Sequence, residues 1–243
     1  MFFLRAEPVW WARRVDTRQL SSKSVTPIAI CLFVALSGLY YAISSLNGIR
    51  ASNGYIFWAP HLALDEHVPF VSQWTWAYLS YFPFCISLAI LVRFTPRKLV
   101  VYASAFVAQY LVGGLFFLTM PSRIVPPIPV GTSPADKILS GLQELDGGFN
   151  IFPSMHVANV VLVIACLWVE QSRWKWIYLA WGCSIIVSTV LVKRHYILDI
   201  PGGVLLGIAA GYGVYSALRP GTIRQDVEAR HANGLKPSQE GWL

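Results

Sequence analysis

The sequence predicts an all-α fold: an integral membrane six-transmembrane-helix bundle with a short amphipathic helix on the outer face. Of the 243 residues, 55% are hydrophobic and only 13% are charged. Soluble domains carry about twice that charged fraction, and disordered chains are far less hydrophobic. A helix needs roughly 20 apolar residues to cross a bilayer. Six candidate runs lie at about 25–46, 73–93, 98–119, 155–171, 176–192 and 197–218.

Two charged segments flank the predicted catalytic bundle, which spans residues 25–218. Residues 1–24 contain five basic residues and no sustained apolar run. That composition is typical of an interfacial segment on a membrane surface and unlike that of a cleavable signal peptide. Residues 219–243 combine mixed charges with Gly and Pro, as a terminal tail does. The sequence therefore predicts one membrane domain between two peripheral segments.

The distribution of Lys and Arg predicts the orientation of the bundle. The formal net charge is +7, and 14 of the 19 basic residues fall in the terminal segments and in alternate turns between spans. Because cytoplasmic loops carry an excess of Lys and Arg, both termini are expected in the cytoplasm. The connections 47–72, 120–154 and 193–196 then face the periplasm, the lumen or the exterior of a cell (plasma or inner) membrane. Basic residues at span ends also argue against nucleic acid as a partner.

The long connection 120–154 contains the predicted amphipathic helix. Ser133 is a suitable N-cap and Pro134 a suitable first helical residue. Leucine and isoleucine then recur at helical spacing until Gly147, which suits a helix C-cap. We expect a helix over 134–146 on the outer membrane surface. Two readings are open from the sequence: the helix is part of the substrate site, or it is only a packing element.

The last predicted span carries Gly203, Gly207 and Gly211 at four-residue spacing. Small residues in that pattern let two helices approach closely. The partner helix could belong to the same bundle or to a second copy of the chain. A homo-oligomer through this glycine face is therefore one expectation, and packing inside the bundle is the other.

Two clusters of polar residues sit at the predicted outer ends of spans. The first, at the start of the fourth span, contains Ser154 and His156. The second, between the fifth and sixth spans, contains His195 and Asp199. Ionisable groups at membrane depth are costly and are functional candidates by default.

The spacing of these residues suggests their chemistry. On a helix, His195 and Asp199 would share one face, so the carboxylate could accept a proton from one imidazole nitrogen. The other nitrogen would then be free as a base or nucleophile. Ser154 and the N–H groups of its helix start could bind an anion, while His156 could act as a general acid or base. Arg123 offers a bidentate donor for phosphate oxygens.

Two other kinds of site remain open at this stage. Ser154, His195 and Asp199 form a nominal serine-hydrolase triad, although the Gly-x-Ser-x-Gly elbow is missing. That reading also leaves Arg123 and His156 without a role. His156, His195 and Asp199 could instead hold a metal ion, but no outer-face Cys or His-x3-His pattern supports such a site. We expect no metal and no cofactor.

The pattern Pro-Ser-x-His, followed by Ser-x6-His-x3-Asp, resembles the type-2 phosphatidic acid phosphatase superfamily. That family contains membrane lipid phosphatases, lipid phosphotransferases and soluble vanadium haloperoxidases. The resemblance covers nearly the whole chain, because the membrane branch has six spans and an outer-face site. The Phe-Pro-Ser-x-His form and residues 64–70, Leu-Asp-Glu-His-Val-Pro-Phe, look closer to the inositol phosphorylceramide synthase-like branch. Taken alone, residues 65–67 are expected to form a solvated turn.

The resemblance implies a role for each residue of the two clusters. His195 would be the nucleophile that takes up a phosphoryl group, and Asp199 would orient it and stabilise its charge. His156 would protonate the leaving alkoxide and then activate water or an acceptor hydroxyl. Ser154 and Arg123 would hold the phosphoryl oxygens where charge accumulates in the transition state.

Two positions depart from the family pattern. Phe116 stands where the family has a Lys, seven residues before its Arg, and Thr189 stands where an Arg usually follows the Ser of the third motif. Two phosphate-binding cations are therefore missing from their usual places. Lys193 or Arg194 could replace one of them. Anchoring to lipid headgroups is the other reading of this basic pair.

The resemblance thus implies a metal-independent membrane enzyme that cleaves a lipid phosphoester at the outer leaflet. With water as acceptor it would be a lipid phosphatase acting on a monoester or pyrophosphate. With another hydroxyl as acceptor it would be a headgroup phosphotransferase. A non-catalytic scaffold or transporter is a third reading, which gives no reason for the complete residue set. The expected partners are a phosphorylated lipid substrate and membrane lipids.

Overall fold

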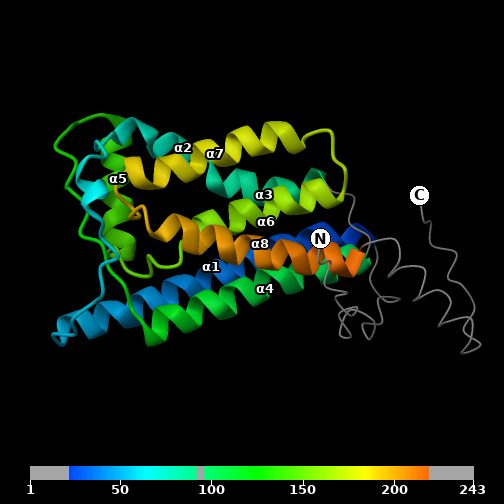
Figure 1. Ribbon diagram of the computed structural model, residues 1–243, viewed down its shortest axis with the longest axis horizontal. Helices are drawn as coiled ribbons and strands as arrows, with labels where there is room; N and C mark the ends of the chain where they lie inside the picture. Colours follow the sequence, from blue (N-terminus) through cyan, green and yellow to red (C-terminus); the bar gives the residue numbers. More distant parts are fainter. Residues whose placement is uncertain (1–21, 92–95, 219–243) are drawn as a thin grey trace, which may run out of the picture.

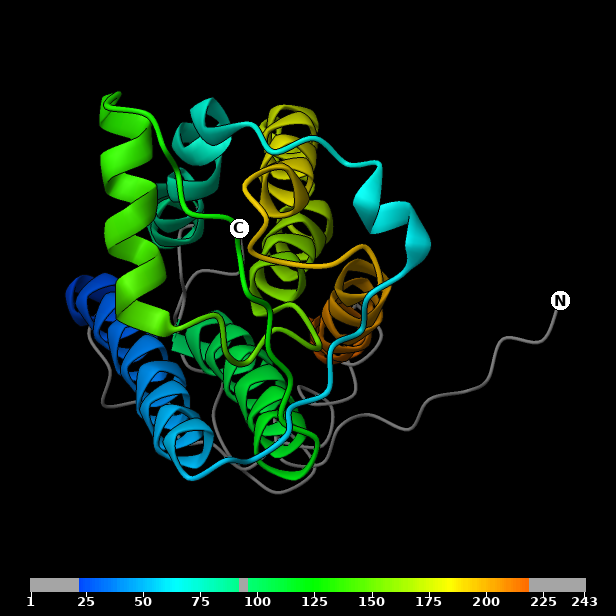
Figure 2. The ribbon, with the colours of Figure 1, turned by 90° about the vertical axis from the view of Figure 1, so that its left-hand side faces the viewer.

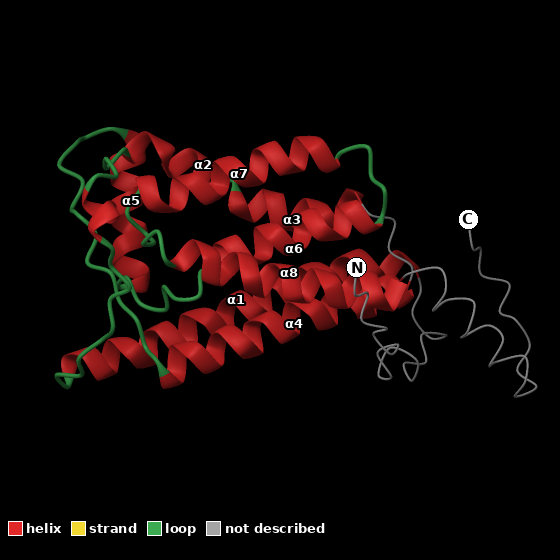
Figure 3. Ribbon diagram, in the orientation of Figure 1, coloured by secondary structure: helices red, strands yellow, loops and turns green. Residues whose placement is uncertain are grey.

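A computed structural model describes residues 22–91 and 96–218 of the chain, and its regular structure there is helical. The predicted segment 1–24, apart from its last residues in the first helix, and the tail 219–243 lie outside the described residues. Figures 1 and 3 show the helices running along the long axis of the molecule. These lengthwise helices are α1 (Ser22–Ser52), α2 (Thr75–Leu79), α3 (Tyr81–Leu91), α4 (Pro96–Thr119), α6 (Met155–Val169), α7 (Lys175–Leu191) and α8 (Asp199–Leu218).

Among the described residues, three helical segments are long and apolar enough to cross a bilayer, namely Pro27–Ser52, Lys98–Thr119 and Asp199–Leu218. The helices α6 and α7 are apolar but shorter, with 15 and 17 residues. At 1.5 Å per residue they span roughly 23 and 26 Å, less than a hydrocarbon core of about 30 Å. The all-helical fold is confirmed, whereas the six-span arrangement remains a prediction.

The second predicted span, 73–93, is interrupted in the structure. The helix α2 ends at Leu79, and α3 begins at Tyr81. Pro83 explains the break, because it has no N–H to donate to the carbonyl four residues earlier, that of Leu79, and its ring crowds that carbonyl. The indole of Trp181 on α7 donates to the Ser80 hydroxyl at 2.8 Å, so the junction is tied to a neighbouring helix.

One end of the bundle is covered by loops and by α5 (Pro134–Asp146), which has the predicted bounds. Ser133 caps it by accepting the Asp136 N–H at 3.2 Å, and Gly147, at φ 60°, ends it in the left-handed region. Figure 2 shows α5 lying across the end of the bundle while the long helices are seen nearly end-on. Its Leu139 is fully buried, and Leu145 is 74% exposed. Its position relative to a membrane remains a prediction.

The helix α6 is the centre of the bundle, since it contacts α3, α4, α7 and α8. Its residues Val160, Leu162 and Val163 are fully buried in the main hydrophobic core. Close packing of such side chains stabilises the contacts between helices in a membrane. The start of α6, at the end of the bundle where α5 lies, is therefore held firmly in place.

The glycines of α8 pack against α6 within the same chain. A Cβ added at Gly203 would lie 2.5 Å from the Ser154 carbonyl oxygen, and one at Gly207 would lie 2.7 Å from that of Ala158. At Gly211 it would lie 2.6 Å from the Ala165 Cβ. Packing inside the bundle is thus the correct reading of this pattern. Because α6 covers these glycines within the chain, they are not needed for an oligomer contact, and a homo-oligomer stays an untested prediction.

We predict that Gly207→Ala destabilises the fold by about 1–3 kcal/mol, because the new methyl would overpack the α6–α8 contact. The matched control is Gly213→Ala on the same helix, where an added Cβ meets nothing within 4 Å. That control should be neutral or stabilise the helix by up to about 1 kcal/mol. Thermal unfolding in detergent, followed by tryptophan fluorescence, measures both. Equal melting temperatures for the two variants would contradict the α6–α8 packing.

Candidate active site

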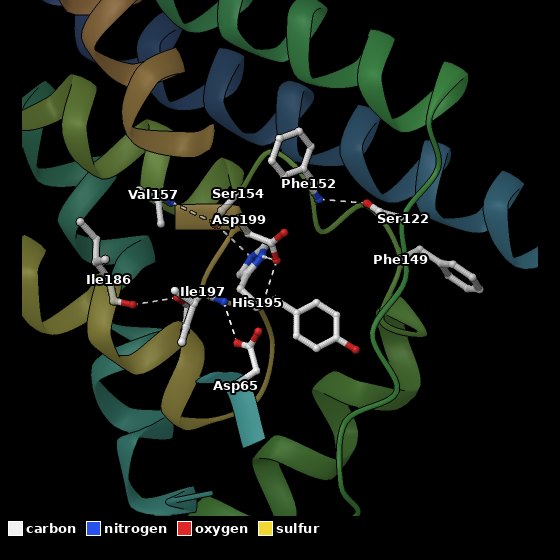
Figure 4. A network of polar contacts seen from close by, with 12 residues as sticks. Asp65, Ser122, Phe149, Phe152, Ser154, Val157, Ile186, His195, Ile197 and Asp199 are labelled. Carbon is white, nitrogen blue, oxygen red and sulfur yellow. Dashed lines mark hydrogen bonds and ion pairs between the residues drawn. The ribbon is translucent and has the colours of Figure 1, made fainter. Parts of the chain in front are cut away.

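His195 lies in the turn that joins α7 to α8, and two other side chains hold its imidazole. Its Nδ1 lies 3.1 Å from Asp199 Oδ2, and its Nε2 lies 3.1 Å from the Ser154 hydroxyl oxygen. His195 is 5% exposed, and Asp199 and Ser154 are fully buried. Figure 4 shows the three side chains converging where α6 and α8 begin. The structure thus brings together three residues of the two predicted clusters.

Ser154 owes its position to its role as the N-cap of α6. Its hydroxyl oxygen accepts the Val157 N–H at 3.4 Å, and its own N–H donates to the Asp199 carbonyl at 3.3 Å. The peptide bond between Phe152 and Pro153, just before it, is cis. The Phe152 N–H donates to the Ser122 hydroxyl at 2.9 Å. These bonds join the starts of α6 and α8 to the segment after α4.

The backbone of the turn around His195 has a partner for each successive N–H. The His195 N–H donates to the Thr189 carbonyl at 3.1 Å, and the Tyr196 N–H donates to Asp199 Oδ2 at 2.8 Å. The Ile197 N–H donates to Asp65 Oδ1 at 2.8 Å. Asp199 therefore fixes both the imidazole and the backbone beside it, and Asp65 fixes the next peptide.

Asp65 is a site residue that the sequence analysis missed. It lies in the 3-10 helix η2 (Ala63–Glu66) and is only 7% exposed, so the expected solvated turn is wrong at this position. Its neighbours Glu66 and His67 are exposed, as expected. Nothing in the sequence indicated this contact, because Asp65 and Ile197 are 132 residues apart. The residues around a carboxylate in a turn do not indicate whether it faces solvent or accepts a hydrogen bond from a distant part of the chain.

His156 lies in the first turn of α6 and faces His195 at a ring-centroid distance of 5.9 Å. Two tyrosines contact its ring, Tyr78 stacked at 4.7 Å and Tyr81 tilted at 4.3 Å. These rings belong to α2 and α3, on either side of the interruption in the second predicted span. They hold the second histidine next to the first, with the two imidazole rings in an edge-to-face arrangement.

The four predicted phosphate-binding residues have different surroundings. Ser154 contacts His195 directly, and Arg194, next in sequence to His195, is buried at 4% exposure. The Lys193 ammonium donates to the Asp65 carbonyl at 2.8 Å. Arg123 donates from Nε to the Gly147 carbonyl at 3.4 Å and places its guanidinium carbon 4.8 Å from the centre of the Phe149 ring. Arg123 and Lys193 thus have protein partners at the edge of the site.

The site gathers negative charge as well as positive charge. Asp199 Oδ1 is buried and has no hydrogen-bond partner among the described residues. Burial raises the pKa of the Tyr196 hydroxyl, and the nearby carboxylates of Asp65 and Asp199 raise it further. Tyr196 therefore stays neutral at physiological pH.

Within residues 22–91 and 96–218, no group of three His, Cys, Asp or Glu side chains is arranged to hold a metal ion.

This arrangement leaves one nitrogen of His195 available for chemistry. If Nδ1 carries the proton that is donated to Asp199, Nε2 keeps its lone pair and accepts the Ser154 hydroxyl hydrogen. An imidazole in that state is a base or a nucleophile, and the adjacent carboxylate stabilises the positive charge that develops on it. The same order of three residues is also that of a serine-hydrolase triad.

We predict that Ser154→Ala raises the reactivity of His195 toward diethyl pyrocarbonate, because Nε2 loses its hydrogen-bond partner. Ser133→Ala is the matched control, since Ser133 caps α5 in the same way, and each variant should cost about 1 kcal/mol of stability. Mass spectrometry of the peptide containing His195 measures its modification rate. Equal rates in the two variants would contradict the contact between Ser154 and His195.

Comparison with known proteins adds an independent finding. The family model described as the PAP2 superfamily matches residues 98–222, just over half of the chain. The matched segment includes Arg123, Ser154, His156, His195 and Asp199. No match was found among curated proteins or among solved structures.

The family match and the apolar helices together describe a membrane protein. Members of this superfamily are generally phosphatases or phosphotransferases that act on phosphate esters. The match does not distinguish the inositol phosphorylceramide synthase-like branch from the others. The pattern around His156 and His195 is thus accounted for at the level of the family, and the chain belongs to the PAP2 superfamily.

Proposed function

We propose that the protein is a membrane lipid phosphatase that hydrolyses a lipid phosphate monoester or pyrophosphate at the outer leaflet. The reaction would pass through a phosphohistidine on His195. The observation that carries this proposal is the buried contact of the His195 imidazole with Asp199 on one side and Ser154 on the other. It gives Nε2 a lone pair and a fixed direction.

In the first step, the lone pair of His195 Nε2 attacks phosphorus and forms a P–N bond. The bond from phosphorus to the ester oxygen breaks, and that oxygen takes a proton from His156 and leaves as an alcohol. For a pyrophosphate, the leaving group is the phosphate that remains on the lipid. Asp199 stays ionised and accepts the hydrogen bond from Nδ1–H, so it stabilises the positive imidazole ring. General acid catalysis by His156 contributes typically 10²–10⁴-fold.

In the second step, His156 accepts a proton from water as the water oxygen attacks phosphorus. The P–N bond breaks, inorganic phosphate leaves, and both histidines return to their starting states. The two imidazole rings are neighbours, with centroids 5.9 Å apart, and the proposal has both of them act on the same phosphoryl group. Each step is an in-line displacement that depends chiefly on positioning and charge stabilisation.

The phosphoryl oxygens would be held by Ser154, Arg123 and Arg194. The Ser154 hydroxyl lies beside Nε2, where it would donate to one of the phosphoryl oxygens. The buried Arg194 follows Lys193 and directly precedes His195 in the sequence, and it would supply positive charge. Arg123 would exchange the Gly147 carbonyl for the phosphate, because a phosphate carries an opposite charge and can accept two parallel bonds from the guanidinium. The Lys193 ammonium donates to the Asp65 carbonyl, and a role in phosphate binding would use another of its three N–H groups.

The second candidate is a lipid headgroup phosphotransferase, of the inositol phosphorylceramide synthase-like kind or a related phospholipid or sphingolipid synthase. An alcohol would replace water in the second step, and the same residues would act. The burial of Asp65 favours this candidate, because the 64–70 stretch that resembles that branch is packed against the His195 turn. A non-catalytic scaffold or transporter would have no use for the buried His195 contacts.

We also propose that the site faces the periplasm, the lumen or the cell exterior, with both termini in the cytoplasm. In Figure 1 the start of α1 and the end of α8 lie at the end of the bundle opposite the His195 turn. The excess of basic residues in the terminal segments supports the same orientation.

We predict that His195→Ala lowers phosphate release from lipid phosphates by at least about 10³-fold, because the nucleophile is lost. His156→Ala should lower it by about 10²–10⁴-fold. The control is His67→Ala, an exposed histidine outside the site, which should keep the wild-type rate. Purified protein in lipid micelles, assayed for free phosphate, measures all three. Wild-type turnover by His195→Ala would overturn the assignment.

Water and alcohol acceptors are separated by the products of the wild-type protein. The phosphatase proposal predicts that free phosphate appears in step with loss of the lipid phosphate. Lipid carrying a transferred headgroup, with no phosphate released from any lipid phosphate, would overturn it in favour of the phosphotransferase.

A further inference from the structure

The segment between α1 and α2 crosses the end of the bundle and contacts both the Arg123 segment and the His195 turn. Its residues 58–65, here named the strap, begin beside the segment that carries Arg123 and end beside the turn that carries His195. Figure 2 shows this segment passing the start of α8 on its way to η2.

The first end of the strap is bound through the backbone of Trp58. The Trp58 N–H donates to the Pro121 carbonyl at 3.1 Å, and the Trp58 carbonyl accepts the Arg123 N–H at 3.0 Å. Its indole meets the Phe152 ring edge-on at 5.1 Å. The strap therefore touches the peptide of Arg123 and the residue that precedes the cis bond before Ser154.

The second end of the strap is bound to the His195 turn through two oxygens of Asp65, and a third closes the strap's own 3-10 turn. Its Oδ1 accepts the Ile197 N–H and its Oδ2 accepts the Leu62 N–H, each at 2.8 Å. Its backbone carbonyl accepts the Lys193 ammonium, also at 2.8 Å. Figure 4 shows the carboxylate reaching the Ile197 peptide from below the His195 ring. Asp65 thus holds the His195 turn on both sides of the histidine.

These bonds constrain a turn that has little regular structure of its own. Lys193 has φ 54°, in the left-handed region that residues other than glycine seldom adopt. The Ile197 N–H lies between the end of α7 and the start of α8, and a buried N–H without a partner would be strongly unfavourable. Of the N–H bonds made by His195, Tyr196 and Ile197, only the last goes to an acceptor outside residues 188–199.

We propose that Asp65 is a positioning residue for His195, and this inference rests on the proposed function. By fixing the Ile197 peptide and the Lys193 side chain, Asp65 keeps the His195 imidazole aligned with Asp199 and Ser154. It touches neither the substrate nor the reacting atoms. Its loss therefore lowers the rate of phosphoryl transfer more than it weakens substrate binding, because a displacement of about 1 Å can cost about 10²-fold.

The kinetic test compares Asp65→Ala, Asp65→Asn and the control Glu66→Ala. Glu66 is the neighbouring carboxylate on η2, and its side chain is 72% exposed. We expect Asp65→Ala to lower kcat about 10–100-fold with KM changed less than about twofold. Asp65→Asn keeps one oxygen for the Ile197 N–H and should recover part of the loss. Glu66→Ala should match the wild type.

Hydrogen exchange of the peptide covering residues 195–198 tests the same idea without any turnover. We expect faster exchange in Asp65→Ala than in the wild type and no change in Glu66→Ala. If Asp65→Ala does not fold, Asp65→Asn is compared with Glu66→Ala by the same readout, and slower turnover with faster exchange is again expected. Unchanged exchange, or a kcat within about twofold of the wild type, would overturn the role of Asp65. A wild-type protein without activity would overturn the proposed function, and exchange would still decide the contact.

Discussion

The buried bond between His195 and Asp199 is the constraint on which the rest of the site depends. A carboxylate without exposure at the start of an apolar helix is unfavourable unless it has partners. Asp199 finds them in the His195 imidazole and the Tyr196 N–H. The same residue accepts the Ser154 N–H through its carbonyl. One residue therefore joins the two helix starts and sets the direction of the imidazole.

The packing of the bundle serves this bond directly. The helices α6 and α8 approach closely because glycines of α8 face α6, so their first residues, Ser154 and Asp199, lie next to each other. Aromatic rings from α2 and α3 place His156 at the same end. The strap then holds the turn from outside the bundle. The side chains of Ser154, His195 and Asp199 are thereby linked in one hydrogen-bonded network, although Asp199 Oδ1 has no partner among the described residues.

Much of the fold and of the site could be predicted because the signals were local. Prolines, glycines and serine caps set the ends of α5 and the start of α6, and apolar runs gave the long helices. The four-residue spacing of His195 and Asp199 predicted their contact. They meet across a turn and a helix start, however, and not on one helix face. The reason is that Asp199 is the first residue of α8.

The features that could not be predicted depend on distant contacts. The burial of Asp65 and its bond to the His195 turn follow from the path of a long connection, which no local pattern specifies. The hydrogen bond from the Lys193 ammonium to the Asp65 carbonyl follows from the path of the same connection. The break at Ser80 had a local cause in Pro83, but the apolar run through it concealed the interruption.

The most direct test of the central claim is to trap the phosphorylated protein. The wild type is mixed with a labelled lipid phosphate, denatured within one turnover and digested, and the phosphopeptide is mapped. The account predicts a label on His195 that survives alkali and is lost in acid, as a phosphoramidate is. A label on Ser154 that survives acid would contradict it and indicate a serine nucleophile.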